Sequence, residues 1–176
     1  TQQLKTTPGA KVSDMLRFGM VMNLPYNMDQ CQWNGRGPVE NYSDRKLSQN
    51  VGIYKSSADK LFFPYVRPQE TGTMSDLRWW NQTDGGGFGF RVESDKMFSA
   101  SALHYDLLSL DEGEEKHQRH SQSVEKSKYT NLFIDLLQQG VGGVNSWDAD
   151  GRARKGHRVE YKDYTFKFRL SPKTVY

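Results

Sequence analysis

Hydrophobic and polar residues alternate along several stretches of this chain, most clearly close to its C-terminus. In residues 164–170, aromatic or aliphatic side chains alternate with polar ones. A period of two is typical of a β-strand with one buried and one solvent-exposed face. The same alternation predicts a strand at 129–136, and residues 97–108 are predicted to form a longer one. Shorter strands are predicted at 16–23, 28–33, 51–54, 77–80 and 88–93.

These short strands, separated by turn-forming residues, predict an all-β fold. Their number and spacing favour an antiparallel β-sandwich that residues 1–176 form as one domain, or as the major part of one. Two polar stretches interrupt the pattern. Residues 111–128 are expected to form either a long loop or a short exposed helix, and residues 148–157 a second loop. A short helix is also predicted at 44–49.

Composition and charge narrow the classes of partner. Hydrophobic residues make up only 35% of the 176 residues, but aromatic residues reach 12%, and large aromatic side chains can form a core from fewer residues. The net charge is only +3, and the basic residues of 152–173 are interpreted as a solvated face rather than a nucleic-acid-binding stripe. No stretch approaches the ~20 consecutive apolar residues of a membrane span. The single cysteine, Cys31, excludes an internal disulfide. We therefore predict neither a nucleic-acid nor a membrane partner.

A glycine-rich turn at 140–143 follows one of the predicted strands and leads through Asn145 and Ser146 to Trp147. Glycines allow a positive φ and a close approach of the backbone. A tryptophan held on a rigid turn can stack on the apolar face of a sugar ring, and its indole N–H donates a hydrogen bond. From the residues alone, a core position for Trp147 is nevertheless favoured, because tryptophan is more often buried than used for binding.

Two further segments, 33–45 and 63–72, combine turn-forming residues with arginines and carboxylates. The carboxylates in or near these segments are Glu40, Asp44, Glu70 and Asp76. Glycoside hydrolysis uses two carboxylates about 5–9 Å apart, so a catalytic pair is one interpretation. The other is that these groups form ion pairs which fix the loops, with Arg36, Arg45, Arg67 and Arg78 as partners. We favour the ion pairs, because they are the commoner use of such carboxylates.

The histidines give little indication of a metal site. His117 and His120 have the i, i+3 spacing of two ligands on a helix, but they lie in a charged stretch without a cysteine partner, which favours solvent exposure. His104 falls in a predicted strand, where a packed histidine is the simpler interpretation. The chain contains no nucleophile elbow, phosphate-binding glycine loop or zinc signature.

Three motifs and a closing strand occur in fixed order along the chain. They are Trp-Asn-Gly-Arg-Gly-Pro-Val-Glu-Asn-Tyr-Ser-Asp-Arg at 33–45, Pro-Tyr-Val-Arg-Pro-Gln-Glu-Thr-Gly at 64–72, Gly-Val-Gly-Gly-Val-Asn-Ser-Trp at 140–147 and Tyr-Thr-Phe-Lys-Phe-Arg-Leu-Ser-Pro at 164–172. Together they resemble the C-terminal domain of large bacterial family-2 β-galactosidases. Each motif is moderately specific alone, whereas three in register are strongly specific. The resemblance extends from about residue 17 to residue 172.

The resemblance implies an antiparallel supersandwich similar to that of galactose mutarotases. It also implies that the nucleophile and the acid/base, both glutamates, lie on a separate TIM-barrel domain, so we expect no catalytic residue in this chain. The chain is then expected to be the accessory domain of a retaining enzyme that hydrolyses terminal β-D-galactosides such as lactose. Its partners would be the β-galactoside and the TIM-barrel domain, and the isolated chain is expected to be inactive.

The resemblance also assigns a role to Trp147. In this family the tryptophan of the Gly-Gly-x-x-Ser-Trp motif packs beside the galactosyl subsite, which implies that Trp147 is a substrate-binding residue supported by Gly143, Asn145 and Ser146. We therefore predict that Trp147 lies on the rim of the sandwich with its ring partly exposed. The magnesium and sodium ions of the family are bound mainly by other domains, so neither a metal site nor a cofactor is expected here.

The chain also departs from the family pattern. The family often has an acidic residue where Val144 or Asn145 stands, and the polar insert at 112–128 is longer than expected. The family domain is larger, so its first strands are expected to lie before Thr1. Such a truncation would leave an unpaired edge or an apolar patch, which invites pairing with another copy.

Two alternatives to the accessory domain stay open on the sequence. A stand-alone carbohydrate-binding module would bind sugar without a catalytic partner. An aldose-1-epimerase would need an acid and a base, for which His104 and Glu70 form the single candidate pair. The second alternative rests on fold similarity, which does not imply function.

Overall fold

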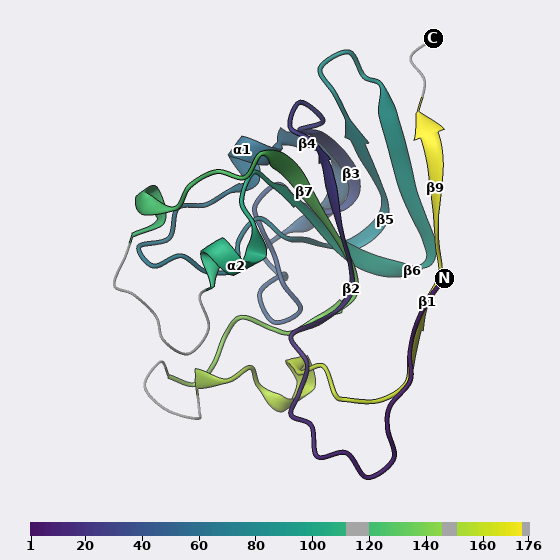
Figure 1. Ribbon diagram of the computed structural model, residues 1–176, viewed down its shortest axis with the longest axis vertical. Coiled ribbons are helices and arrows are strands. Elements are labelled where there is room, and N and C mark those ends of the chain that lie inside the picture. Colours follow the sequence, from purple (N-terminus) through teal and green to yellow (C-terminus); the bar gives the residue numbers. More distant parts are fainter. Residues whose placement is uncertain (112–119, 146–150, 174–176) are drawn as a thin grey trace.

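The chain folds into antiparallel β-sheet, as predicted. The computed structural model describes residues 1–111, 120–145 and 151–173. Figure 1 shows one large sheet with the small second sheet beside it. The strands are β1 (Gln2–Leu4), β2 (Arg17–Pro25), β3 (Gln30–Gly37), β4 (Asn50–Ser57), β5 (Met74–Thr83), β6 (Gly89–Leu103), β7 (Tyr129–Gln138), β8 (Tyr164–Phe166) and β9 (Phe168–Lys173). The helices are α1 (Ala58–Leu61) and α2 (Leu107–Leu110), with single 3-10 turns at Ser121–Ser123 and Lys155–His157.

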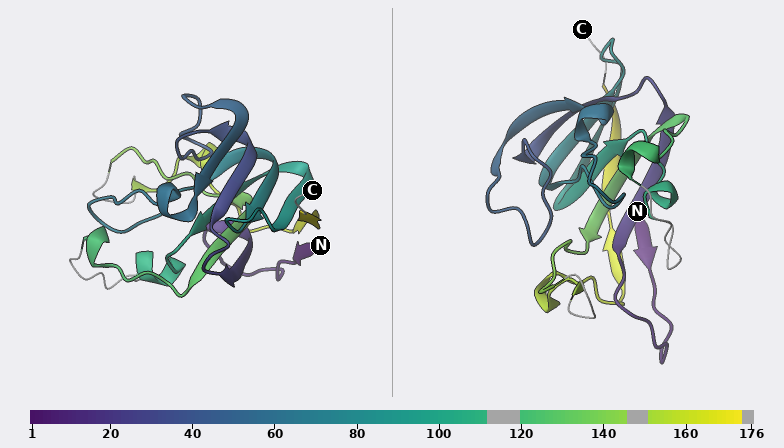
Figure 2. Two further views of the ribbon diagram at one scale, coloured as in Figure 1. Left: turned by 90° about the horizontal axis from the view of Figure 1, so that it is seen from above. Right: turned by 90° about the vertical axis from the view of Figure 1, so that its left-hand side faces the viewer.

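The long strand β6 organises the large sheet, whose strand order is β2-β7-β6-β5-β3-β4. Its first half pairs with β9 and its second half with β7, so two strands share one edge of β6, and β5 pairs along the other. Glu93 lies opposite Trp79 and Phe98 lies opposite Leu77, so the residues of β6 between Glu93 and Phe98 bulge out against Arg78 of β5. A bulge bends its strand and increases the local twist, which gives the sheet the curvature seen in Figure 2.

The core includes side chains from both faces of β7, where the consecutive residues Leu132, Phe133 and Ile134 are all buried. Trp33 and Trp80 are almost completely buried and stack with their ring centroids 5.5 Å apart. The small sheet of β1 and β8 adds Phe166, which is fully buried and lies 6.4 Å from Phe98 between ring centroids. The two sheets therefore enclose one hydrophobic core, as an all-β sandwich requires.

The structure corrects several predicted elements. Residues 164–170 are not one strand, because Lys167 separates β8, which pairs with β1, from β9, which pairs with β6. The strand predicted at 97–108 ends at Leu103, and the non-alternating run after it forms α2. The helix predicted at 44–49 is wrong: the Arg45 N–H donates to the carbonyl of Tyr42 in a tight turn.

The predicted strand at 88–93 is the first part of β6 rather than a separate element. Of the polar insert at 111–128, the described part contains the 3-10 turn at Ser121–Ser123. Of the stretch 148–157, the described part contains the turn at Lys155–His157. No helix in the described residues is both long and apolar enough to cross a membrane.

Candidate functional site

The predicted site lies on the loop that follows β7. Gly143 is exposed and Asn145 is half-buried. Ser146 and Trp147 lie outside the described residues. The position of the Trp147 ring, at the rim or in the core, therefore stays a prediction, whereas the loop that leads to it can be described atom by atom.

Backbone hydrogen bonds and one carboxylate fix the start of this loop. The Gln139 N–H donates to the carbonyl of Leu16 at 2.8 Å, and the Gly140 N–H donates to the carbonyl of His157 at 2.8 Å. The two oxygens of Asp44 then accept the next two amides, Oδ1 from Val141 at 3.1 Å and Oδ2 from Gly142 at 2.8 Å. Four consecutive amides are thus held by groups from three distant segments, which fixes the course of the loop.

Close approach, and not an unusual backbone conformation, explains the glycine at 140. A Cβ at this position would lie 2.3 Å from Asp44 Oδ2 and 2.9 Å from His157 Cβ. Neither Gly140 nor Gly142 has a positive φ. Of the two reasons that the sequence offered for these glycines, close packing of the backbone is confirmed and the positive φ is wrong.

A second carboxylate, Glu40, joins the motif at 33–45 to the motif at 64–72. Its side chain is only 8% exposed. Oε1 accepts hydrogen bonds from the Arg45 guanidinium and the Tyr65 hydroxyl. Oε2 accepts the Gly72 backbone N–H at 2.6 Å and the Thr71 hydroxyl at 3.2 Å. Burial, together with the nearby Glu40 carboxylate, raises the pKa of Tyr65.

Asp76 fixes the base of the segment that carries Glu40 and Asp44. It accepts Arg36 Nε at 2.6 Å and Lys46 Nζ at 2.7 Å. Partial burial acts to raise the pKa of Asp76, but the hydrogen bonds from Lys46 and Arg36 outweigh it and lower the pKa. Arg36 also donates to the carbonyl of Gln49 at 2.7 Å, so both ends of the segment are tied together.

A buried charge cluster lies beside the glycine loop. Arg17 donates from Nη2 to Glu70 Oε2 at 3.1 Å, and its Nε lies 3.6 Å from Asp135 Oδ2. Burial raises the pKa of Asp135 to about 7, although the Arg17 cation opposes the shift; the Glu70 carboxylate adds to it. The guanidinium of Arg17 also packs over the ring of Phe133, 5.2 Å from its centroid.

Arg17 and Glu70 line a cavity of about 710 Å³, whose other polar residues are Asp111, Gln138 and Gln139. Its walls include Gly140 and Val141 of the glycine loop together with apolar side chains before β2 and on α2. These side chains are Leu16, Leu107, Leu108 and Leu110. The cavity is thus next to the loop that leads to Trp147, and its walls are mostly apolar.

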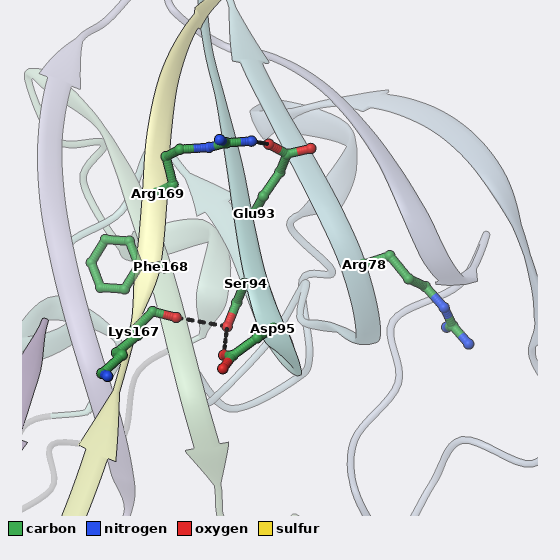
Figure 3. A pocket seen from close by; sticks show the side chains of 7 residues that line it. All are labelled: Arg78, Glu93, Ser94, Asp95, Lys167, Phe168 and Arg169. Carbon is green, nitrogen blue, oxygen red and sulfur yellow. Dashed lines mark hydrogen bonds and ion pairs between the residues drawn. The ribbon is translucent and has the colours of Figure 1, made fainter.

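A second hollow, of about 510 Å³, lies at the bulge of β6 and is drawn in Figure 3. Two of its charged side chains pair with each other, Arg169 Nη2 with Glu93 Oε2 at 2.8 Å, and the Ser94 hydroxyl donates to the Lys167 backbone carbonyl at 2.7 Å. Arg78 points away from the other side chains in this view. None of the predicted site residues lines this hollow, so it is not the candidate site.

The preference for ion pairs over a catalytic pair is confirmed for Glu40 with Arg45 and for Asp76 with Arg36. The partners of the other two carboxylates differ from the prediction. Glu70 pairs with Arg17, and Asp44 binds backbone amides. Sequence reasoning missed the cluster around Arg17 and Asp135, because an ion pair between neighbouring strands leaves no signal in the spacing of one strand.

The structure gives His104 and Glu70 separate surroundings. His104 is buried, its ring stacks on Tyr26 with centroids 3.8 Å apart, and its Nδ1 lies 3.4 Å from the Thr130 hydroxyl. Glu70 is held by Arg17 and by the Thr73 hydroxyl at 3.0 Å. Within the described residues, no hydrogen bond or ion pair joins His104 to Glu70.

The remaining histidines do not assemble a metal site in the part of the chain that the structure describes. His120 is exposed, and its Nδ1 lies 3.2 Å from the carbonyl of Val66. His117 lies outside the described residues. Within 1–111, 120–145 and 151–173, no group of three or more His, Cys, Asp or Glu side chains could hold a metal ion.

Comparison with known proteins identifies the family. Residues 1–170 match the family model described as the β-galactosidase small chain. A β-galactosidase of Priestia megaterium is 30% identical over 165 residues, which cover 94% of this chain and 15% of the relative. A β-galactosidase of Lactobacillus delbrueckii subsp. bulgaricus is 34% identical over 80% of this chain, and one of Vibrio cholerae is 36% identical over 74%. These segments cover 13% and 12% of the two relatives.

The chain thus spans about a seventh of the length of the curated relatives that it matches. The matched region includes all three motifs, and the same motifs are the segments that Glu40 and Asp44 connect in the structure. On the match to the family model and on these relatives, the chain belongs to the β-galactosidase small chain family.

Proposed function

We propose that this chain is an accessory domain of a retaining β-galactosidase, in which Trp147 forms one wall of the galactose subsite. The two catalytic glutamates would lie on a TIM-barrel domain of the same polypeptide. The observation that carries the proposal is the connection of the three motifs by two carboxylates: Glu40 binds the motif at 64–72, and Asp44 binds the loop at 140–145.

The physical basis is preorganisation. A tryptophan ring stacks on the apolar face of galactose most effectively when its support is already ordered, because ordering a loop on binding reduces affinity. The loop before Trp147 is held at four consecutive amides from Gln139 to Gly142. The same rigidity would help to orient the sugar for attack by a nucleophile on another domain.

The carboxylates of this chain are suited to support rather than to catalysis. A general acid must be free to donate its proton to the glycosidic oxygen. Glu40 accepts donors from both neighbouring loop segments, and both oxygens of Asp44 accept backbone amides. A change of protonation in either group would break the bonds that hold the loops, so hydrolysis by two glutamates elsewhere is the consistent mechanism.

The decisive experiment replaces the matching segment of the Priestia megaterium β-galactosidase by this chain and assays the chimera on lactose. Trp147→Ala is expected to lower kcat/KM about 10- to 100-fold, since burying one large apolar side chain contributes roughly 1.5–3 kcal/mol. Phe88→Ala is the matched control, because Phe88 is an exposed aromatic residue, 66% accessible, at the distant hairpin between β5 and β6. Equal activity of the two variants would overturn the proposal.

A second experiment uses the isolated chain. It should show no turnover of a chromogenic galactoside, because the catalytic glutamates are expected elsewhere. Its tryptophan fluorescence should not respond to galactose or lactose at millimolar concentration. Binding at that level, lost in Trp147→Ala, would instead identify a stand-alone carbohydrate-binding module.

A further inference from the structure

We propose that Asp44 is a positioning residue of the sugar site, which fixes the course of the glycine loop that precedes Trp147 in the sequence. This inference rests on the proposed function of Trp147 and assigns to the first motif a role in the placement of the third. The residues that carry it are 98 positions apart in the sequence and are brought together by the fold.

The geometry is specific for a carboxylate at this position. Each oxygen of Asp44 accepts one amide of the loop, Val141 N–H at 3.1 Å and Gly142 N–H at 2.8 Å. Hydrogen bonds to a charged acceptor are stronger than bonds between neutral groups. An asparagine can offer one oxygen in place of two, so it should preserve about half of the interaction.

Gly140 is the complementary part of this arrangement. Its missing Cβ leaves the space that the Asp44 carboxylate fills, since an added Cβ would lie 2.3 Å from Oδ2. Gly140→Ala should therefore displace the carboxylate without removing its charge. This variant provides a second test, which keeps the inference falsifiable if Asp44→Ala does not fold.

Asp84 offers a matched control with the same chemistry in a different place. Its Oδ1 accepts the Gly86 N–H at 2.9 Å and the Phe88 N–H at 3.0 Å in the hairpin between β5 and β6. This hairpin projects from the end of the sheet away from the glycine loop (Figure 1). Asp84→Ala removes an aspartate that ties two amides, as Asp44→Ala does, but leaves the site untouched.

The first experiment measures amide hydrogen exchange by NMR in this chain. Asp44→Ala should accelerate exchange of Val141 and Gly142 about 10- to 100-fold, because each amide loses a bond to a charged acceptor. Asp44→Asn should give a smaller acceleration, and Gly140→Ala should resemble Asp44→Ala. Asp84→Ala should accelerate Gly86 and Phe88 and leave the loop unchanged. Unchanged exchange of Val141 and Gly142 in Asp44→Ala would overturn the inference.

The second experiment uses the chimeric β-galactosidase. Asp44→Ala should lower kcat/KM in the same direction as Trp147→Ala, Asp44→Asn should recover part of the loss, and Asp84→Ala should leave activity unchanged. If Asp44 acts through Trp147, the double variant should be no worse than Trp147→Ala, whereas independent effects would add. Additive losses would contradict the positioning role.

The two experiments separate this inference from the proposed function. If Trp147→Ala is silent in the chimera, the proposed function fails and so does a role of Asp44 in sugar binding, even where exchange shows that Asp44 holds the loop. If Trp147→Ala reduces activity while Asp44→Ala leaves both exchange and activity unchanged, only the inference about Asp44 fails.

Discussion

Replacing Glu40 by alanine should be among the most destabilising single changes in the loops of this domain. The side chain is 8% exposed, and its removal leaves two donors of buried residues without an acceptor, the Gly72 N–H and the Tyr42 hydroxyl, which donates to Oε2 at 3.3 Å. The Thr71 hydroxyl keeps a second acceptor, the carbonyl of Phe63 at 3.4 Å. The Arg45 side chain is half exposed and can be hydrated, so its lost ion pair contributes less than 1 kcal/mol. The Tyr65 hydroxyl also reaches solvent more readily than the two buried donors do.

The magnitude follows from the two buried donors. An unsatisfied buried donor costs about 1–3 kcal/mol, and bonds to a charged acceptor lie toward the upper end. We therefore expect Glu40→Ala to lower the free energy of unfolding by about 4 kcal/mol, and the melting temperature by about 10 °C for a chain of this length. Glu40→Gln, which keeps one acceptor oxygen, should lower it by about half as much.

Urea unfolding followed by tryptophan fluorescence measures both variants against Arg45→Ala as the control. The m-value should stay constant, since the same surface is exposed on unfolding. The reasoning is refuted if Glu40→Ala is no more destabilising than Arg45→Ala. That outcome would mean that Glu40 contributes only a surface ion pair and that the two motifs hold together without it.

Two further predictions concern the strands β2 and β7. The folded-state pKa of Asp135, about 7, lies above its unfolded value of 3.8, so the stabilising contribution of this group is fully present at low pH and is lost as pH rises toward 7. Asp135→Asn should therefore make the free energy of unfolding less dependent on pH between pH 4 and pH 7. At pH 8 the variant should be more stable than the parent by a few kcal/mol, since each unit of pKa shift corresponds to about 1.4 kcal/mol. A lower free energy of unfolding at pH 8 would show instead that the ion pair with Arg17 dominates. Gly19→Ala should destabilise by about 3 kcal/mol or more, since the new Cβ would lie 2.2 Å from the Ile134 carbonyl oxygen. Thermal melts should show no comparable loss for Gly85→Ala, which has nothing within 4 Å.

The all-β fold could be predicted because alternation in the sequence marks β7 and the C-terminal strands, although β7 is buried on both faces in the structure. β7 and β2 begin or end within two residues of the predicted ranges. The break at Lys167 could not be predicted, because alternation continues from β8 into β9 although the two strands pair with different partners. The hydrophobic period of a strand indicates which of its faces is buried, but it carries no information on which other strand pairs with that strand.

The sequence predicted which segments form the candidate site, but it did not predict the contacts between them. The motifs named the glycine loop and the two acidic segments, but the bonds of Glu40 to Gly72 and of Asp44 to Gly142 span 32 and 98 positions. Their partners are backbone amides, which every residue except proline possesses. No side-chain pattern can therefore reveal them. The predicted arginines are the partners of Glu40 and Asp76, whereas Glu70 pairs with a different arginine, Arg17.

The way in which Glu40 and Asp44 are used suggests how acidic motif residues of this kind can be distinguished from catalytic ones. A catalytic carboxylate of a glycosidase has to exchange a proton or form a bond during each turnover. A carboxylate that accepts backbone amides on both oxygens, as Asp44 does, would release a loop each time it did so. Such an acid is suited to a constant task, and in our proposal the task of Asp44 is to hold the glycine loop that precedes Trp147. A tryptophan that stacks on a sugar, as we propose for Trp147, would need a constant support more than a nearby charge, and the close packing of Asp44 against Gly140 and Gly142 provides one.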